Sequence, residues 1–375
     1  MKRTIYVMTS LSHKRVFETF EPRTDMEQMI LGPMPKITGI PTGIVPEDYS
    51  DFKIKNIKCY WNRKEMQDAV DKFKPDIYVE ASLPVARGIR LPSGCKKVYV
   101  SHGMVGNHVK GIIKKAGFDT SAWKGNDLYC GATNVFADWI KHVAKVGDDK
   151  ILLNALPQLD ILYDSDYYNS YRKKVLNKTK NPDAEKIILF VGFCCKDRYD
   201  FNDHNEDYFR TAIELEKIAR QHNWLVMIKP RHTYDAMVRF LKGHAWGRKY
   251  LKPYADIQNS KHLHFITTTG HIYRYFFADA FVTNGTSTVE VEACSMKKPL
   301  FVVQTHLTGP DAYDMVKNGA AMPIPDLFEL EHDLTEYFDK GRFHWPNQQE
   351  KRIVDMGISF DGKMHNRIQN KLARM

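Results

Sequence analysis

The sequence lacks the patterns that define several common classes of protein. Its six cysteines include no Cys-x-x-Cys pair, and none stands at zinc-finger spacing from a histidine. No apolar run approaches the length of a membrane span, and the apolar part of the N-terminus is too short for a signal peptide. No Gly-x-Gly-x-x-Gly pattern follows the first predicted strand, which argues against a dehydrogenase. We therefore expect a cytoplasmic protein with reduced cysteines and no transmembrane segment, located at most at the inner face of the membrane.

What the chain does have is size, apolar content and positive charge. Its 375 residues are too many for one ordinary core and suit two domains, and 43% of them are hydrophobic. The formal net charge of +10 favours an anionic partner such as a nucleotide, a phosphate polymer, a nucleic acid or a membrane surface. A solvated basic surface without a partner explains the charge equally well, because lysine is mostly exposed in any protein.

Short apolar segments alternate with amphipathic segments along most of the chain, which is typical of parallel sheets covered by helices on both faces. We predict an α/β fold with two Rossmann-like, doubly wound domains that face a cleft. The predicted strands are 4–8, 75–79, 97–100, 127–130, 151–153, 187–191, 225–228, 264–266, 280–282 and 300–303. The predicted divisions are an acceptor domain at 1–165, a polar linker at 166–184, a nucleotide-donor domain at 185–340 and a C-terminal tail at 341–375 that packs back on the first domain.

One strand-to-helix turn carries a hydroxyl-rich pattern. After the apolar residues 280–282 the chain continues with Thr286, Ser287 and Thr288, and Glu292 follows about one helical turn later. Backbone N–H groups and hydroxyls at the start of a helix can bind a phosphate, and a carboxylate one turn further can accept hydrogen bonds from ribose hydroxyls. The alternative is an ordinary helix start in which Ser287 or Thr288 is the N-cap.

This stretch, together with three others in the same order, resembles a known family. The segment 278–299 resembles the nucleotide-binding segment of GT-B transferases, and specifically that of the CDP-glycerol glycerophosphotransferases that make teichoic acid and capsule polymers. The segments 98–103, 154–162 and 227–232 resemble further motifs of that family, with Pro157 and Asp160 retained in the second. The chain departs from the family at the first acid, where it has Asn284-Gly285.

The resemblance implies roles for several polar residues that follow predicted strands. His102 corresponds to the proposed catalytic base, and a histidine can accept the proton of an attacking hydroxyl near neutral pH. His232, with Lys229 and Arg231, corresponds to the site that faces the donor phosphates. Gly192 ends another strand and is a candidate for a second phosphate contact. The competing interpretations are a histidine that only stabilises its loop and a solvated basic turn, and for Gly192 a glycine followed by two bases, which is common after strands.

The predicted function is transfer of a glycerol-phosphate, polyol-phosphate or glycosyl group from a nucleotide-diphosphate donor to an acceptor hydroxyl on an anionic polymer. The acceptor is a cell-surface glycan or, as an alternative, modified DNA, and neither a metal nor another cofactor is required. Two further alternatives are a nucleotide-sugar epimerase or hydrolase and a non-catalytic module that binds polyanions. The basic, amphipathic segment 366–375 either makes a peripheral contact with an anionic membrane or packs on the first domain.

Overall fold

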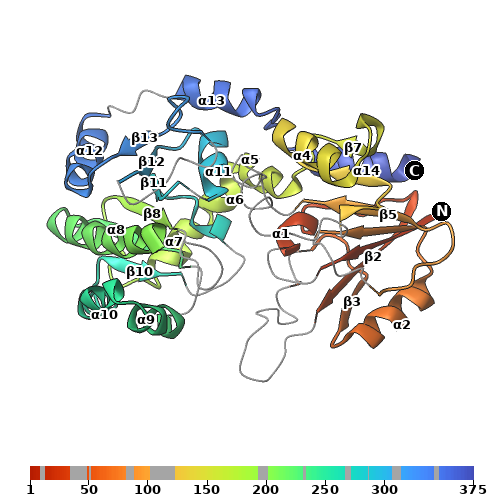
Figure 1. The fold of residues 1–375 in the computed structure, drawn as a ribbon, viewed down its shortest axis with the longest axis horizontal. Helices are drawn as coiled ribbons and strands as arrows, with labels where there is room; N and C mark the ends of the chain where they lie inside the picture. Colours follow the sequence, from red (N-terminus) through yellow and green to blue (C-terminus); the bar gives the residue numbers. More distant parts are fainter. Residues whose placement is uncertain are drawn as a thin grey trace. The chain divides into compact units, whose positions relative to one another are not determined.

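The computed structural model divides the chain into two compact units. Unit 1 comprises Met1–Asp164 and Asp355–Met375, and unit 2 comprises Ser165–Val354. The structure describes residues 1–8, 13–33, 49, 52–81, 88–101, 123–192, 202–230, 234–266, 272–285, 287–305, 314–341 and 346–375. Each unit is built around one parallel sheet, which confirms the predicted α/β class with two Rossmann-like domains (Figure 1).

The sheet of unit 1 has seven strands in the order β3-β2-β1-β4-β5-β6-β7, and all its described pairs are parallel. The central strands are buried on both faces, which explains why they read as continuous apolar runs. The strands are β1 (Lys2–Val7), β2 (Met26–Pro33), β3 (Ile57–Tyr60), β4 (Ile77–Glu80), β5 (Lys96–Val100), β6 (Leu128–Cys130) and β7 (Ile151–Leu152).

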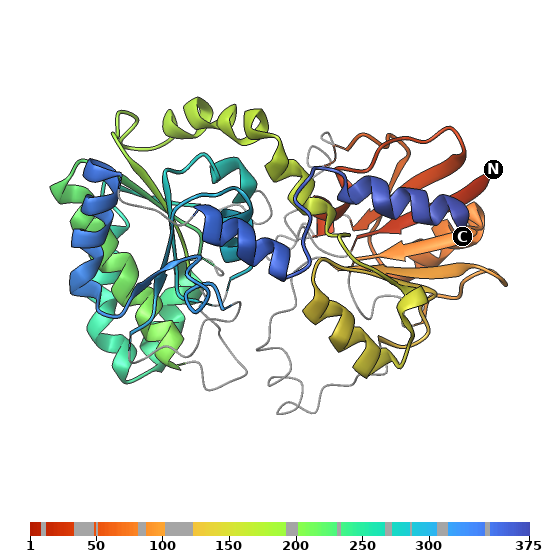
Figure 2. The same ribbon diagram turned by 90° about the horizontal axis from the view of Figure 1, so that it is seen from above.

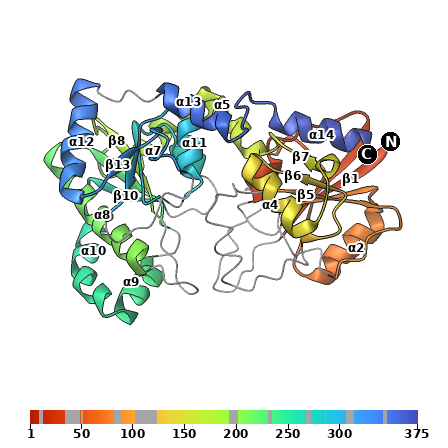
Figure 3. The ribbon, with the colours of Figure 1, turned by 45° about the horizontal axis from the view of Figure 1, so that its top comes forward.

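Helices cover both faces of this sheet (Figure 3). On one face, α1 and α14 contribute Phe17 and Leu372 to a core that also contains Tyr6 of β1. On the other face, α2 and α4 pack on the sheet through separate apolar clusters. The helices of unit 1 are α1 (Lys14–Phe17), α2 (Arg63–Phe73), α4 (Asn134–Ala144), α5 (Asp160–Tyr163) and α14 (Met364–Arg374), with the 3₁₀ segments η4 (Asp148–Lys150) and η5 (Pro157–Leu159).

The sheet of unit 2 repeats this strand order with six parallel strands, β10-β9-β8-β11-β12-β13. Its main core lies between the sheet and the helices α8, α9, α10 and α12. The strands are β8 (Ile187–Val191), β9 (Leu225–Ile228), β10 (Leu263–Phe265), β11 (Ala280–Thr283), β12 (Leu300–Val303) and β13 (Met322–Ile324). The helices are α6 (Ser165–Asn169), α7 (Tyr171–Leu176), α8 (Asn202–Gln221), α9 (Tyr234–Gly243), α10 (Leu251–Ile257), α11 (Val289–Ser295), α12 (Leu327–Lys340) and α13 (Pro346–Asp355), with η6 (Trp246–Tyr250) and η7 (Ile272–Tyr275).

The segment 166–184, predicted as a linker, begins with α6 and α7 and belongs to unit 2. Its helices are bound to the rest of unit 2 by contacts that could not be predicted from their polar composition. Arg172 donates to the backbone oxygen of Phe277 over 3.3 Å, and the guanidinium of Arg274 lies 5.0 Å from the ring centre of Tyr171. The boundary between the units therefore comes before α6, at Asp164–Ser165.

The tail at 341–375 is divided between the units. Helix α13 lies almost entirely in unit 2, whereas α14 belongs to unit 1 and runs beside the N-terminal strand (Figure 2). The Nζ of Lys2 donates to the backbone oxygen of Ala373 over 2.7 Å, and Ile368 and Leu372 are fully buried. The apolar face of α14 is thus part of the core of unit 1, which leaves it no apolar face for a membrane.

Candidate functional site

The strand order of unit 2 reverses its direction between β8 and β11. From β8 the chain continues to β9 and β10 on one side, and from β11 it continues to β12 and β13 on the other. At such a switch point the loops that follow the two strands separate, and ligands of open α/β sheets bind there, beyond the carboxyl ends of the strands. The residues that follow these strands are Gly192 after β8 and Asn284-Gly285 after β11. The sequence-predicted site residues of unit 2 that the structure describes all follow β8, β9 or β11.

The turn between β11 and α11 is closed by hydrogen bonds within the chain. The N–H of Ser287 donates to Oε1 of Glu290 over 2.9 Å, and the N–H of Val289 donates to Oγ of Ser287 over 3.3 Å. This arrangement is close to a capping box, in which a carboxylate three residues into the helix accepts from the N-cap N–H. Gly285 has a φ of +81°, which a glycine adopts without strain. Ser287 thus stands one residue before the N-cap Thr288, and its N–H binds a carboxylate of the protein itself.

Glu292, the predicted ribose contact, lies one turn further in α11. Its side chain is 2% exposed, and its Oε1 accepts a hydrogen bond of 2.8 Å from the hydroxyl of Tyr273 in η7. Tyr273 is equally buried. A carboxylate is costly to bury, and its oxygens can accept several hydrogen bonds. Glu292 is thus a buried carboxylate that accepts a hydrogen bond from a neutral hydroxyl, and it lies next to the turn that follows β11.

The predicted leaving-group site follows β9, the neighbour of β8. Lys229 is partly buried there, and its Nζ lies 3.5 Å from the backbone oxygen of Pro230. Arg231, His232 and Thr286 lie outside the described residues. In unit 2 the predicted cationic segment and the carboxylates of α11 therefore follow strands on opposite sides of β8.

Gly192 has a packing reason to be a glycine. A Cβ at this position would lie 2.3 Å from Cδ2 of Tyr208 and 2.7 Å from Cζ of Phe190. The rings of Tyr208 and Phe190 stack with their centres 5.3 Å apart in the core of unit 2. The close approach of the Tyr208 ring accounts for Gly192 without a ligand.

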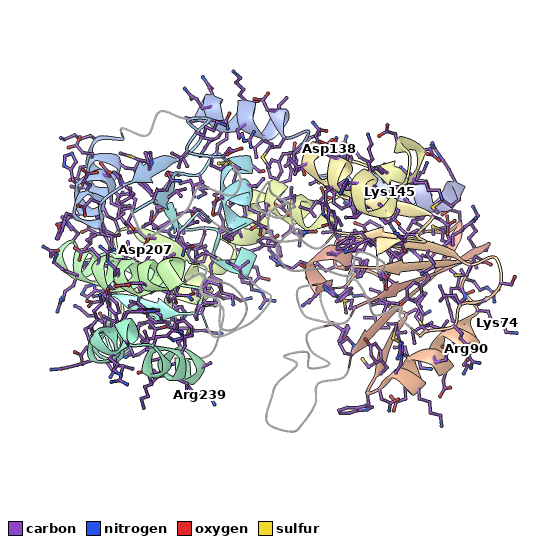
Figure 4. All side chains as sticks on the ribbon, viewed as in Figure 1. Lys74, Arg90, Asp138, Lys145, Asp207 and Arg239 are labelled. Atoms are coloured by element: carbon purple, nitrogen blue, oxygen red, sulfur yellow. The ribbon has the colours of Figure 1, made fainter. Side chains whose placement is uncertain are left out.

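A buried carboxylate that sequence reasoning missed connects helix α8 to the end of a strand in unit 2. Asp207, fully buried in α8 (Figure 4), accepts a hydrogen bond of 2.6 Å from the hydroxyl of Thr305, two residues after β12. Its other oxygen accepts from Arg210 over 3.1 Å. The sequence offers no signal for this pair, because the partners are 98 residues apart and each is an ordinary polar residue. The contact fixes the first turns of α8 to the end of β12.

In unit 1 the corresponding switch point lies between β1 and β4. His102, the predicted base, lies outside the described residues, and β5 ends two residues before it at Val100. Sequence reasoning did not identify two buried polar residues at strand ends of this sheet, Glu80 and Ser101. Glu80 and Ser101 are the last residue of β4 and the first residue after β5, two neighbouring strands.

The motif residue Asp160 is used within unit 1. Its carboxylate accepts hydrogen bonds from the N–H groups of Met364 and His365 over 3.0 and 2.7 Å, and it lies 2.7 Å from Nδ1 of His365. It therefore caps the first turn of α14. Acids commonly cap helices, but the sequence does not show which helix Asp160 caps, because Met364 follows it by 204 residues.

The motif pair Lys298-Pro299 precedes β12 and so lies at the amino edge of the sheet, away from the switch-point loops. The Nζ of Lys298 donates to the backbone oxygen of Ala278 over 3.1 Å. Burial lowers the pKa of Lys298, while the nearby carboxylate of Asp279 acts in the opposite direction. This lysine stabilises the junction between β11 and β12.

Within the described ranges, no three His, Cys, Asp or Glu side chains gather closely enough to hold a metal ion. In the same part of the chain, no helix has both the length and the apolar character needed to span a membrane.

Two Rossmann-like units with parallel sheets of seven and six strands define a GT-B-like fold. The chain is similar over its whole length to the UDP-GlcNAc 2-epimerase of Neisseria meningitidis bound to UDP-GlcNAc, with a TM-score of 0.64, 12% identity and 100% of that chain covered. The UDP-GlcNAc 2-epimerase of Methanocaldococcus jannaschii, in complex with UDP-GlcNAc and UDP, gives a TM-score of 0.59 at 12% identity, with 100% of both chains covered.

A third similar structure is a variant of the wall teichoic acid polymerase TagF with CDPG, with a TM-score of 0.58 and 12% identity, covering 100% of this chain and 88% of that one. No protein-family model matches the sequence. No curated protein matches it either. The fold is thus shared by enzymes of two kinds, epimerases and a polymerase, and at this identity the likeness concerns the fold alone.

Proposed function

We propose that the protein is a GT-B transferase that moves a glycerol-phosphate, polyol-phosphate or glycosyl group from a nucleotide-diphosphate donor to a hydroxyl of a polymer. The observation that carries the proposal is the position of Glu292. It is a buried carboxylate held by a neutral donor beside the turn that follows β11, at the switch point of the second sheet. The order of four motifs along the chain supports a transferase of the glycerophosphotransferase kind.

In this proposal unit 2 binds the donor. Glu292 accepts hydrogen bonds from the ribose hydroxyls, and the hydroxyls of Thr286, Ser287 and Thr288 contact the part of the donor nearest to α11. Hydroxyl donors suit a buried carboxylate, because each bond to the charged acceptor is stronger than a bond between neutral groups. Gly192 keeps its packing role, and its backbone borders the donor.

The diphosphate lies toward the end of β9, where Lys229, Arg231 and His232 follow the strand. Cations there stabilise the charge that develops on the departing nucleotide when its bond to the transferred group breaks. Unit 1 contributes the acceptor side. His102 takes the proton of the acceptor hydroxyl as its oxygen forms the new bond, and the nucleotide leaves with the bonding electron pair.

The proposed acceptor is an anionic polymer, because the chain carries a net charge of +10. A cell-surface glycan fits the motif order, and modified DNA is the alternative acceptor. Assembly of a surface glycan from activated donors would place the enzyme in the cytoplasm, at the inner face of the membrane.

A thermal-shift screen against UDP-, CDP-, GDP- and ADP-linked compounds tests the donor site. A ligand held at about a hundred times its dissociation constant should stabilise the fold by about 2.7 kcal/mol. We expect one nucleotide series to raise the unfolding temperature. If no series does so, while an anionic polymer binds with a steep salt dependence, the binding-module alternative replaces the transferase.

A nucleotide-sugar epimerase is the second candidate, and the similarity to two UDP-GlcNAc 2-epimerases over the full chain favours it. An epimerase or hydrolase needs no acceptor. Incubation of the protein with UDP-GlcNAc alone, followed by proton NMR of the sugar, therefore separates the two. A new epimer or free sugar would support the second candidate, and an unchanged donor that is consumed only after acceptor is added would support the transferase.

A further inference from the structure

The helical connection between β9 and β10 carries an excess of positive charge. It consists of α9, η6 and α10, which contact one another in unit 2 (Figures 1 and 3). Residues 234–261 contain six lysines and arginines and two acids, Asp235 and Asp256, and all eight side chains are exposed. The six cations, called the α9–α10 basic surface below, are Arg239, Lys242, Arg248, Lys249, Lys252 and Lys261. This segment therefore has an excess of four positive charges, a large share of the net charge of +10 of the whole chain.

The helices of this segment turn their charged sides to solvent because they bury their apolar sides in one core. Met237 and Phe240 of α9 and Tyr254 of α10 belong to the main core of unit 2. Arg239 and Lys242 are three positions apart in α9, so they lie on the same side of that helix. Figure 4 shows Arg239 at the outer margin of α9. The basic side chains of neighbouring helices are thus part of one outer surface of unit 2.

The ion pairs among the described residues leave most of this surface without a counter-charge. Within the described part of the chain, only Lys249 of the six cations has a carboxylate partner, Glu206, at 2.7 Å. Exposed lysines in other parts of unit 2 are paired, for example Lys217 with Glu214 over 2.9 Å. Cations that lie close together without counter-charges repel one another, and an anion bound across them removes this repulsion. The α9–α10 basic surface is therefore suited to bind an anion from outside the chain.

The extent of the surface favours a polymer over a small anion. Helix α9 alone has 10 residues, which corresponds to a length of about 15 Å. One compact anion cannot contact cations on two helices and the turn between them, whereas a chain with a phosphate every few ångströms can do so. Tyr234 is 38% exposed, and the other aromatic side chains of 234–261 are at least partly buried, so the surface offers little area on which bases could stack. Binding should therefore depend on the phosphates of the polymer.

We propose that the α9–α10 basic surface binds a phosphodiester-linked polymer through its phosphates. The proposal goes beyond the proposed function, because it concerns binding of a polymer outside the donor site. The six cations lie on helices and the segments that join them, whereas the predicted donor residues of unit 2 that the structure describes follow β8, β9 or β11 or begin α11. The apolar sides of α9 and α10 are buried, so they are not available to enter a membrane.

A triple variant with Lys242→Gln, Lys252→Gln and Lys261→Gln tests the proposal. The three side chains are exposed, so their replacement should leave the fold intact. Fluorescence anisotropy would measure the binding of poly(glycerol phosphate) and of single-stranded DNA with the same number of phosphates, at several salt concentrations. The loss of three phosphate contacts should weaken binding on the order of a hundredfold at about 0.1 M salt. It should also reduce the slope of log K against log salt by about 2.

The matched control is the triple variant with Lys58→Gln, Lys64→Gln and Lys72→Gln. These lysines are exposed residues of β3 and α2 in unit 1. Their replacement lowers the net charge of the protein by the same amount. The control should bind both polymers within about twofold of wild type and with the same salt slope. It separates the local charge of the α9–α10 basic surface from the charge of the whole protein.

A third arm with vesicles of phosphatidylglycerol tests a membrane surface as the partner. A loss of polymer binding in the α9–α10 variant and not in the control supports the proposal, and a preference of wild type for one polymer identifies the source of the phosphates. If wild type binds the vesicles but neither polymer, or binds nothing, the proposal is wrong. Equal losses in the two triple variants contradict it as well. The thermal-shift screen with nucleotides tests the donor site separately, so the two proposals can fail independently.

Discussion

The two units repeat one strand order but use their motif acids differently. In unit 1, Asp160 accepts two backbone N–H groups of α14 and contacts the His365 ring, all within 3.0 Å. In unit 2, Glu292 is buried against the hydroxyl of Tyr273 beside the switch point of the sheet. The first acid is explained by the chain itself. The second is placed where ligands of this type of fold bind.

The difference teaches that a motif match does not separate a structural acid from a binding acid. Asp160 and Glu292 came from the same pattern of resemblance, and each precedes or lies in a helix. The hydrogen-bond donors around each carboxylate distinguish a structural role from a binding role. Three contacts to one distant helix indicate a role in folding, whereas a neutral hydroxyl partner at a strand-order switch is compatible with binding.

The largest expected effect concerns catalysis, because the proposed base belongs to unit 1 and the proposed donor site belongs to unit 2. His102→Ala should lower turnover by roughly 10²–10⁴, the usual contribution of a general base, and leave donor affinity nearly intact. His232→Ala should reduce both, because the lost cation is also felt by the bound diphosphate. Steady-state kinetics with donor titrations checks this. Full transfer by His102→Ala with each candidate acceptor would refute the assignment of the base.

Asp160→Ala should change stability and not binding. It leaves the first turn of α14 uncapped and the partly buried His365 without its partner, so we expect the free energy of unfolding to fall by about 2–4 kcal/mol. Urea denaturation provides the measurement. Asp326→Ala is the control, because Asp326 caps α12 through one exposed contact to the N–H of Phe328 and should cost only about 1 kcal/mol. If both variants lose the same free energy of unfolding, Asp160 contributes no more to stability than an ordinary helix cap.

Gly192→Ala sharpens the comparison inside unit 2. The new methyl group must displace the buried Tyr208 ring, so we expect a loss of stability of about 1–3 kcal/mol. In a Tyr208→Leu background the same substitution should cost less, since the leucine leaves room. Additive losses in this double-mutant cycle would mean that the ring is not the reason for the glycine.

Tyr273→Phe should have the smallest effect. It removes the hydroxyl that donates to Glu292 but keeps the buried ring, so we expect a loss of stability of about 1 kcal/mol and a few-fold weaker donor binding. Thermal denaturation with and without nucleotide measures both quantities. A loss of stability with unchanged nucleotide affinity would assign the Tyr273–Glu292 contact to folding alone.

The sequence predicts the central strands well because burial on both faces leaves a continuous apolar run, as in β4, β8 and β12. It does not predict β2, β3 or β13. The first begins with the polar stretch Met26–Gln28, and the second is an edge strand whose side chains are only partly buried. The local sequence pattern does not reveal an edge strand, because such a strand is defined by the neighbouring strand with which it pairs in space.

The site was predictable only in part for a related reason. The turn after β11 and the position of Glu292 follow from local pattern, since a strand, a glycine and a helix start are close in sequence. Capture of the Ser287 N–H by Glu290 was also local, as a Ser-x-x-Glu capping pattern at 287–290. The use of Asp160 by α14 and of Asp207 by Thr305 depends on contacts 98 or more residues apart, which no local pattern contains.

The most direct test of the central claim is the affinity of Glu292→Ala for the nucleoside diphosphate that wild type binds best. Loss of two charge-assisted hydrogen bonds to the ribose should weaken binding by about 2–4 kcal/mol in calorimetry. Glu329→Ala, which removes an exposed acid of α12, should bind like wild type. If a folded Glu292→Ala protein binds the nucleotide as tightly as wild type does, Glu292 does not contact the donor and the proposed site is wrong.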